Sequence, residues 1–184
     1  MEDVYPRFAS IPRWYKDFVI TEKVDGTNAL IEISADGNIR AGSRTRWITP
    51  DQDNFGFAAW VRDNADELRD LGPGRHYGEW YGKGIQRSYG LDRRCFALFN
   101  TGRWSHDNAP ECCDVVPVLG SFSGDSINLA IEESMTLLFQ HGSLIAPGFM
   151  RPEGIVIYSV EAKAFWKKTL DNDRAGQKYR KGLT

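Results

Sequence analysis

Hydrophobic positions along the chain fall mostly into short runs bounded by glycine, proline, asparagine or aspartate. That pattern is typical of β-strands joined by turns. Two longer stretches, residues 51–71 and 125–141, repeat their hydrophobic positions every three to four residues and predict amphipathic helices. Gly72 and Gly142 follow these stretches as helix stops. The runs expected to be strands are 18–20, 29–33, 39–43, 76–81, 94–100, 114–118, 155–158 and 164–170.

The size of the chain favours one domain with a core of its own. It has 184 residues, 41% of them hydrophobic and 12% aromatic, which is enough for a packed core. Pro6 and Pro12 argue against a long helix in residues 1–17. Trp14 and Tyr15 are expected to dock this first segment onto the domain.

Charge and cysteine content exclude several classes of protein. A net charge of −2 and a pI near 5.9 argue against a general nucleic-acid-coating protein but leave room for a local basic groove. Cys95, Cys112 and Cys113 cannot form a disulfide framework or a Cys-x-x-Cys zinc site. No hydrophobic run approaches the ~20 residues of a membrane span, and the N-terminus lacks the pattern of a signal peptide. A cytoplasmic protein without membrane contact is expected.

Lys23 lies where the first strand meets a tight turn formed by Asp25 and Gly26. Aspartate supports turns by local hydrogen bonds and glycine by its tolerance of positive φ. A free lysine amine, with a pKa of about 10.4, is a poor nucleophile at neutral pH, and burial or neighbouring cations activate it. Taken alone, the same residues also fit an ordinary hairpin with a surface lysine.

Arg44 and Arg46 follow the strand expected at 39–43 and alternate, which predicts that both lie on one face. Two guanidinium groups so placed suit a phosphate, although a solvated charged edge fits equally well. Glu79 lies in an aromatic strand, where an unpaired carboxylate is costly, so it is expected to have a partner. Phe99 shares a strand face with Ala97 and Cys95, which fits either a slot for a planar base or core packing.

The last third of the chain holds one carboxylate and two lysines of interest. Glu153 lies at the start of a β-branched strand, where it suits a divalent cation or serves as a turn residue. Lys167 and Lys168 are adjacent in the last expected strand, so only one of them can face a given side of the sheet.

In this order, the motifs resemble those of the covalent nucleotidyltransferase superfamily, which contains ATP-dependent RNA and DNA ligases and mRNA capping enzymes. The resemblance covers nearly the whole chain and is strongest to small phage and bacterial RNA ligases. It rests on Glu22–Asn28, Gly42–Arg46, Glu79, Phe99, Glu153–Ile157 and Trp166–Lys167.

The resemblance implies an α+β fold, with antiparallel β-sheets flanked by helices around a nucleotide, in an ATP-grasp-like adenylation domain. It implies catalytic roles for Lys23, Asp25, Glu153 and Lys167. It places Arg44 and Arg46 at the nucleic acid, and Mg²⁺ or Mn²⁺ at Glu153. The residues implied to bind the nucleotide cofactor are Glu22, Gly26, Arg44, Glu79, Phe99 and Lys167.

The reaction implied is ATP-dependent joining of 5′-phosphate and 3′-hydroxyl RNA ends or nicks through a lysyl-AMP intermediate on Lys23. Three alternatives stay open: a minimal DNA ligase, a GTP-using capping-type enzyme, and a nucleotide-binding module without catalysis. In the usual last motif, one residue separates two lysines, whereas Lys167 and Lys168 are adjacent.

The expected organisation is an adenylation domain over residues 1–170 and a short basic tail over 171–184. A five-stranded OB barrel, with strands of ~5–6 residues, needs at least ~40 residues, more than follow Lys167. The expectation is therefore that this barrel is missing and that the domain works alone or with a separate protein partner that replaces the barrel.

Overall fold

The short hydrophobic runs pair into two β-sheets, and the computed structural model describes them over residues 17–124 and 126–171. A four-stranded sheet holds β10 (Ala164–Thr169), β9 (Gly154–Ser159), β1 (Phe18–Lys23) and β8 (Val118–Phe122), in that order. A six-stranded sheet has the order β4 (Trp47–Ile48), β3 (Ile39–Gly42), β2 (Thr27–Ile33), β5 (Gly74–Gly82), β6 (Arg94–Leu98) and β7 (Cys113–Val115).

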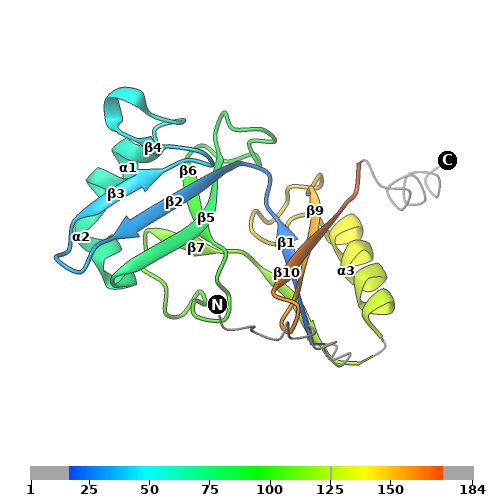
Figure 1. Ribbon diagram of the computed structural model, residues 1–184. Coiled ribbons are helices and arrows are strands. Elements are labelled where there is room, and N and C mark those ends of the chain that lie inside the picture. The colour runs from blue at the N-terminus through cyan, green and yellow to red at the C-terminus, as the bar shows by residue number, and fades with distance from the viewer. Residues whose placement is uncertain (1–16, 125, 172–184) are drawn as a thin grey trace, which may run out of the picture.

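Helices cover one face of each sheet, and the two sheets form two neighbouring layers (Figure 1). All paired strands are antiparallel except β6 and β7, which are parallel. The expected α+β fold with antiparallel sheets and flanking helices is confirmed. The helical elements are the 3₁₀ turn η1 (Pro50–Gln52), α1 (Phe57–Asp63), α2 (Ala65–Leu68), the 3₁₀ turn η2 (Arg69–Leu71) and α3 (Ile127–His141).

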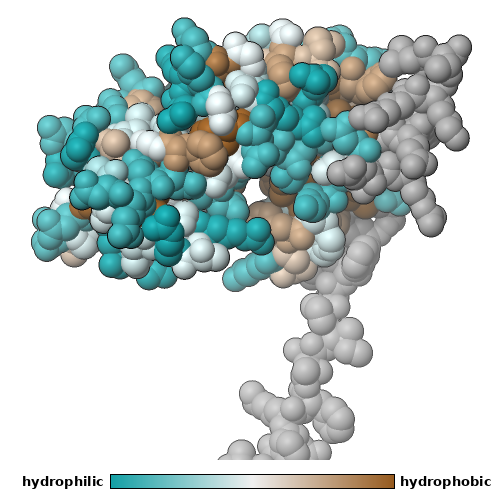
Figure 2. All heavy atoms as spheres, turned by 90° about the horizontal axis from the view of Figure 1, so that it is seen from above, coloured by the Kyte–Doolittle hydropathy of each residue, from teal (hydrophilic) through white to brown (hydrophobic). Residues whose placement is uncertain are grey.

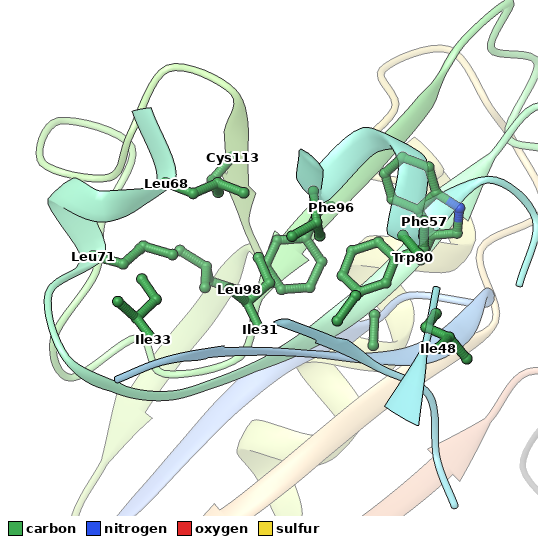
Figure 3. Packing of buried hydrophobic residues seen from close by; sticks show 14 of the residues in the cluster. Ile31, Ile33, Ile48, Phe57, Leu68, Leu71, Trp80, Phe96, Leu98 and Cys113 are labelled. Atoms are coloured by element: carbon green, nitrogen blue, oxygen red, sulfur yellow. The ribbon is translucent and has the colours of Figure 1, made fainter. Parts of the chain in front are cut away.

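The larger core lies between the six-stranded sheet and α1, α2 and η2. The rings of Phe57, Trp80 and Phe96 meet there, with centroids 5.3 and 5.4 Å from Phe57 to the other two (Figure 3). Period-two alternation explains which strand residues enter this core, because Ile31 and Ile33 of β2 are buried while Leu30 and Glu32 point to the other face.

The smaller core lies between the four-stranded sheet and α3. Ile20, Ile155 and Ile157 of the sheet pack against Met135 and Leu138 of the helix. The helix ends at Gly142, as the sequence predicted. The residues that alternate with these in the strands, which include Lys23, therefore face away from α3.

Several expectations about local structure are wrong. The helix expected over 51–71 is broken into η1, α1, α2 and η2. Phe55 and Gly56 have positive φ, so α1 starts only at Phe57, and Asn64, with non-helical backbone angles, separates α1 from α2. The strand expected over 39–43 ends at Gly42. The strand β8 was missed, because its glycine-containing run has little hydrophobic alternation.

The surface seen from above is largely hydrophilic, with hydrophobic atoms in separate patches (Figure 2). Over the described ranges, 17–124 and 126–171, no helix is long and apolar enough to cross a membrane. The expected docking of Trp14 and Tyr15 and the tail after Asp171 lie outside the described residues.

Candidate active site

Lys23 ends β1 and meets Glu153, which directly precedes β9. Its Nζ donates a hydrogen bond of 2.6 Å to Glu153 Oε2, and both side chains are mostly shielded from solvent, with exposed fractions of 22% and 16%. The pairing is fixed by the sheet, since Lys23 lies opposite Gly154 in the β1–β9 register. Two residues that are 130 positions apart in the sequence are thus brought together by neighbouring strands.

Gly154 is required where β9 starts, beside the Lys23–Glu153 pair. Its φ is +152°, and a Cβ there would lie 2.1 Å from the carbonyl oxygen of Lys168 in β10. A side chain at this position would push β10 away from β9. Glycine therefore allows three strands to converge beside Glu153.

Gly26 brings the turn after Lys23 against β5. A Cβ at Gly26 would lie 2.3 Å from the carbonyl oxygen of Trp80, although its φ is not among the positive values. The sequence argument for positive φ was therefore wrong, and close approach of two backbones is the reason for glycine. The approach lets Gly26 N donate a hydrogen bond of 3.0 Å to Glu79 Oε1.

Glu79 is a buried carboxylate on the face of β5 that looks toward Lys23. Burial raises its pKa to about 7, while the positive charge of Lys23 and the Gly26 N–H group oppose that rise. The negative charges of Glu153 and Asp25 add to the rise. Lys23 and these three carboxylates therefore share one electrostatic environment. The partner expected for Glu79 is the backbone N–H group of Gly26.

We expect the Glu79→Gln variant to lose part of the pH dependence of stability. The native pKa of about 7 exceeds the unfolded value of about 4.3, so the native state binds more protons between these values. The free energy of unfolding should then fall as pH rises from about 4 to about 7, by up to about 3 kcal/mol. Glutamine keeps an acceptor for Gly26 N and removes this titration.

Urea unfolding at pH 5 and pH 8 measures the effect. The decrease in free energy of unfolding between the two should be smaller in Glu79→Gln than in the wild type, whereas Glu133→Gln, at an exposed site on α3, should match the wild type. Equal decreases in wild type and Glu79→Gln would contradict the assignment of the raised pKa to this carboxyl group.

Asp25 is held by two residues that sequence reasoning missed. Arg87 Nε lies 2.8 Å from Asp25 Oδ2, and the Tyr89 hydroxyl accepts a hydrogen bond of 2.7 Å from Asp25 N. Arg87 also bonds to Asp171 Oδ2 at 2.6 Å and to the Arg151 carbonyl oxygen at 3.0 Å. One guanidinium group therefore ties the Lys23 turn to the segments that precede β9 and follow β10.

The loop that carries Arg87 and Tyr89 adopts unusual backbone angles. Gln86, Ser88 and Tyr89 have φ values of +43°, +55° and +52°. Left-handed backbone costs energy for residues with side chains, and such strain often occurs at functional sites. The sequence showed this stretch only as a glycine-containing loop without a phosphate-binding pattern.

Lys167 and Lys168 point to opposite faces of the four-stranded sheet. Lys167 lies opposite Val156, which lies opposite Thr21, so Lys167 shares the face of Lys23. Lys168 lies opposite Ile155 on the other face, and its Nζ is 3.3 Å from Glu132 Oε1 of α3. The geometry therefore favours Lys167 over Lys168 as a second cation of the site.

The Glu22 side chain lies away from this site. Its carboxylate is 1% exposed and accepts hydrogen bonds from Ser143 Oγ, Leu144 N and Ile145 N at 2.6, 2.8 and 3.1 Å. Burial raises its pKa, which these hydrogen bonds partly offset. Alternation explains the position, because Glu22 must face α3 if Lys23 faces the site. The expected contact of this side chain with a nucleotide is therefore not supported, and Glu22 anchors the segment after α3 instead.

Phe99, Arg44 and Arg46 lie at the edge of the site. Phe99 directly follows β6, is 40% exposed, and continues the face of Ala97. Arg44 and Arg46 lie in the turn between β3 and β4, where Ser43 N bonds to the Arg46 carbonyl oxygen. Because β3 has already ended at Gly42, strand alternation does not determine which face the two arginines take. Their turn lies at the end of the sheet where β2 begins, beside Asn28.

The carboxylates of the site suit a metal ion that binds together with a phosphate. Among the residues that the structure describes, no group of three or more histidine, cysteine, aspartate or glutamate side chains is placed to hold a metal ion. Mg²⁺ usually binds through one or two carboxylates, substrate phosphates and water. Glu153 offers one partly exposed carboxylate of that kind beside Lys23.

A family model described as RNA ligase matches residues 16–179. No curated protein matches the chain. Solved structures of an RNA ligase from Naegleria gruberi resemble this chain in fold. The form with pyrophosphate gives a TM-score of 0.61 at 21% identity, over 91% of this chain and 52% of the ligase chain.

Two mutant forms of the same ligase give similar values. One, solved without ligand, has a TM-score of 0.62 at 20% identity, over 91% of this chain and 52% of that chain. The other, solved with ATP and manganese, has a TM-score of 0.60 at 20% identity, over 90% and 52%. At this identity the likeness shows the fold alone, and the chain spans about half the length of these ligase chains.

Proposed function

The chain belongs to the RNA ligase family, and from that premise we propose that it is an ATP-dependent RNA ligase. In this proposal it joins 5′-phosphate and 3′-hydroxyl ends through a lysyl-AMP intermediate on Lys23. The observation that carries the proposal is the placement of Lys23, at a strand end within 2.6 Å of Glu153 and in the electrostatic environment of Glu79 and Asp25.

The first step forms a bond between Lys23 Nζ and the α-phosphorus of ATP and breaks the bond from that phosphorus to pyrophosphate. An ammonium group has no lone pair, so a proton must leave Nζ before the attack. Glu153 Oε2, at 2.6 Å, is placed to receive it. The α-phosphate gains negative charge in the transition state, which Lys167 on the same sheet face would stabilise.

Glu153 would also hold Mg²⁺ or Mn²⁺ together with phosphate oxygens, and a metal ion bound there supplies Lewis-acid stabilisation. Because one Glu153 oxygen accepts a hydrogen bond from Lys23, a metal ion held by the same carboxylate would lie close to the nucleophile. Asp25 is held by Arg87 and Tyr89, so its part is to fix the turn that presents Lys23. Arg87 acts through Asp25 and is a positioning residue.

The proposed nucleotide contacts are those that the family resemblance implies, and the faces described above support them. Glu79 accepts hydrogen bonds from the ribose hydroxyls, Phe99 stacks on the adenine, and Gly26 allows the close turn beside them. Arg44, in the turn beside Asn28, lies at the nucleotide, and it contacts the nucleic acid together with Arg46. After adenylylation, AMP passes to a 5′-phosphate end, and a 3′-hydroxyl then attacks that end and releases AMP.

The proposed partners are RNA ends or nicks and a separate protein that holds the RNA. With a net charge of −2, the chain alone should bind a nucleic-acid backbone weakly. Its affinity should fall further as the salt concentration rises. A cytoplasmic location also belongs to the proposal, supported by a cysteine content too low for a disulfide framework.

We expect the protein to gain the mass of one AMP when it is incubated with ATP and magnesium. Intact-mass measurement tests this result, and parallel incubation with GTP separates a ligase from a capping-type enzyme. A gain only with GTP would favour the capping alternative. Binding of ATP without any covalent gain would favour a nucleotide-binding module.

Sealing assays test the RNA assignment. We expect joining of a pre-adenylylated RNA end at low salt, and weaker joining of a plain 5′-phosphate end, because that route also requires the RNA to be held while AMP is transferred. The same nicks made entirely of DNA are the control. Efficient sealing of DNA without preference for RNA would support the DNA ligase alternative. Lysyl-AMP formation without sealing would support the need for a separate protein partner.

A further inference from the structure

The open face of the six-stranded sheet carries one row of hydrophobic side chains that crosses five strands. In the strand register Trp47 lies opposite Gly42, Gly42 opposite Leu30, and Leu30 opposite Tyr77. Phe99 N donates a hydrogen bond of 3.0 Å to the Tyr77 carbonyl oxygen, so Phe99 continues the row beyond Tyr77. Residues opposite one another in a sheet project to the same side. We name these residues the aromatic row.

The aromatic row lies on the face opposite to the larger core. Among the described residues, the helices that pack on this sheet contact its other face. On the face of the aromatic row, a separate hydrophobic cluster buries Tyr81, Cys95 and Ala97 farther along β5 and β6, so the face is open only over the remaining part. Tyr77, Trp47 and Phe99 are 54%, 41% and 40% exposed, which is unusual for three large rings in one line. Three exposed aromatic rings on one face of a sheet indicate a surface that binds planar groups.

Gly42 makes the row nearly continuous. A Cβ at this position would lie 3.3 Å from ring atoms of Trp47 and 3.4 Å from Leu30 Cβ. The Trp47 ring therefore leans over Gly42 toward Leu30 and Tyr77. At ~4.8 Å between neighbouring strands, the row from β4 to β6 spans about 19 Å.

Basic side chains border the aromatic row on both sides. On one side, Arg40 and Arg75 flank Glu32 and form ion pairs with it. The Arg40 guanidinium also lies 3.7 Å from the Trp47 ring centroid. On the other side is the turn with Arg44 and Arg46. Four arginines and two glutamates, Glu32 and Glu79, belong to this face and its edge, which is therefore more basic than the slightly acidic chain as a whole.

We propose that Trp47 and Tyr77 of the aromatic row form a platform on which the unpaired bases of a single-stranded RNA segment stack, while Phe99, at the end of the row, is left to the adenine. Exposed aromatic rings on an open sheet, with arginines beside them, are how proteins bind splayed-out bases and the phosphates that join them. The row ends at Phe99, and the next row on the same face holds Asn28, Glu79 and Ala97. A strand on the platform would therefore lead directly into the candidate active site.

This inference rests on the proposed function, because it names the form of RNA that reaches that site. A duplex already stacks its own bases and has little to gain from exposed rings. The platform therefore favours an end whose last nucleotides are unpaired. Stacking accepts every base, so sequence preference should be small.

The test measures binding of a fluorescein-labelled single-stranded RNA with a 5′-phosphate by fluorescence anisotropy at low salt. We expect Tyr77→Ala and Trp47→Ala each to weaken binding at least about fivefold, the fold-change for a stacking loss at the lower end of base–aromatic contacts. Tyr77→Phe keeps the ring and should bind like the wild type. Leu129→Ala removes an exposed hydrophobic side chain from α3 and is the matched control.

Competition with the same sequence as a blunt duplex should require more competitor than competition with the unlabelled single strand. Wild-type affinity in a folded Tyr77→Ala variant, or equal competition by duplex, would overturn the platform. So would loss of self-association in Tyr77→Ala with unchanged RNA binding, which would make the face a protein interface. Lysyl-AMP formation by the wild type is measured separately, so failure of the platform and failure of the ligase proposal are distinguishable.

Discussion

Replacing Lys23 by alanine should abolish formation of the AMP adduct, because the amine nitrogen is the atom that bonds to phosphorus. A loss of nucleophile differs from a loss of binding, since raising the ATP concentration cannot restore the reaction. Intact-mass measurement after incubation with ATP and magnesium should show no gain for Lys23→Ala. Peptide mapping of the wild type should place AMP on the segment that contains Lys23.

The fold should survive this substitution. Lys23 pairs with Glu153, and both side chains keep some contact with solvent. Loss of such a pair costs about 1 kcal/mol near the surface and more when the remaining charge is buried. Lys23→Met, which keeps the aliphatic stem, provides a second test with less change in packing. A folded Lys23→Ala or Lys23→Met protein that still gains the mass of AMP would show that another residue is the nucleophile.

The sequence was informative wherever a residue's role depends on its neighbours along the chain. Lys23 was expected at the end of a strand and Glu153 at the start of one, and both positions are confirmed. Strand alternation alone separates Lys167 from Lys168, and the register and the Lys168–Glu132 contact agree with it. The same rule applied to Glu22 would have shown that its side chain cannot share the face of Lys23.

The sequence was uninformative where contacts join distant segments through a loop. Arg87 meets Asp25, Arg151 and Asp171, and the last is 84 positions away along the chain. Its loop is shaped by left-handed residues that have no propensity signature, including a tyrosine. The aromatic row could not be predicted from the sequence for a related reason. Trp47, Tyr77 and Phe99 come from three separate segments, and only the strand register and the Phe99 N–Tyr77 O hydrogen bond place them in one row.

Replacing Lys167 by alanine should slow lysyl-AMP formation about 100-fold, whereas replacing Lys168 should change it by less than about twofold. The first figure is typical for loss of one charged group aimed at a developing negative charge. The second follows because Lys168 faces α3, where its contact with Glu132 is a partly exposed ion pair worth less than ~1 kcal/mol of stability. Single-turnover rates at saturating ATP compare the two variants.

The neighbours of Lys167 on the same face of β10 carry no positive charge. Its β10 lies two strands from β1, about 10 Å across the sheet, so a phosphate group fits between Lys167 and Lys23. The nearest position on the same face toward the start of β10 is Phe165, which is 69% exposed and stacks on Tyr158 with ring centroids 4.6 Å apart. The two positions of β10 that flank Lys167 on the same face are Phe165 and Thr169, so neither supplies a second cation.

With no second lysine on that face of β10, the loss in Lys167→Ala should be recovered largely by Lys167→Arg, which restores a positive charge at the same position. Phe165→Lys should partly rescue Lys167→Ala, because it places an ammonium group on the same face two residues away. A larger loss in Lys168→Ala than in Lys167→Ala would reverse the assignment. Equal small losses in both would mean that the α-phosphate lies away from β10 and is met by other cations.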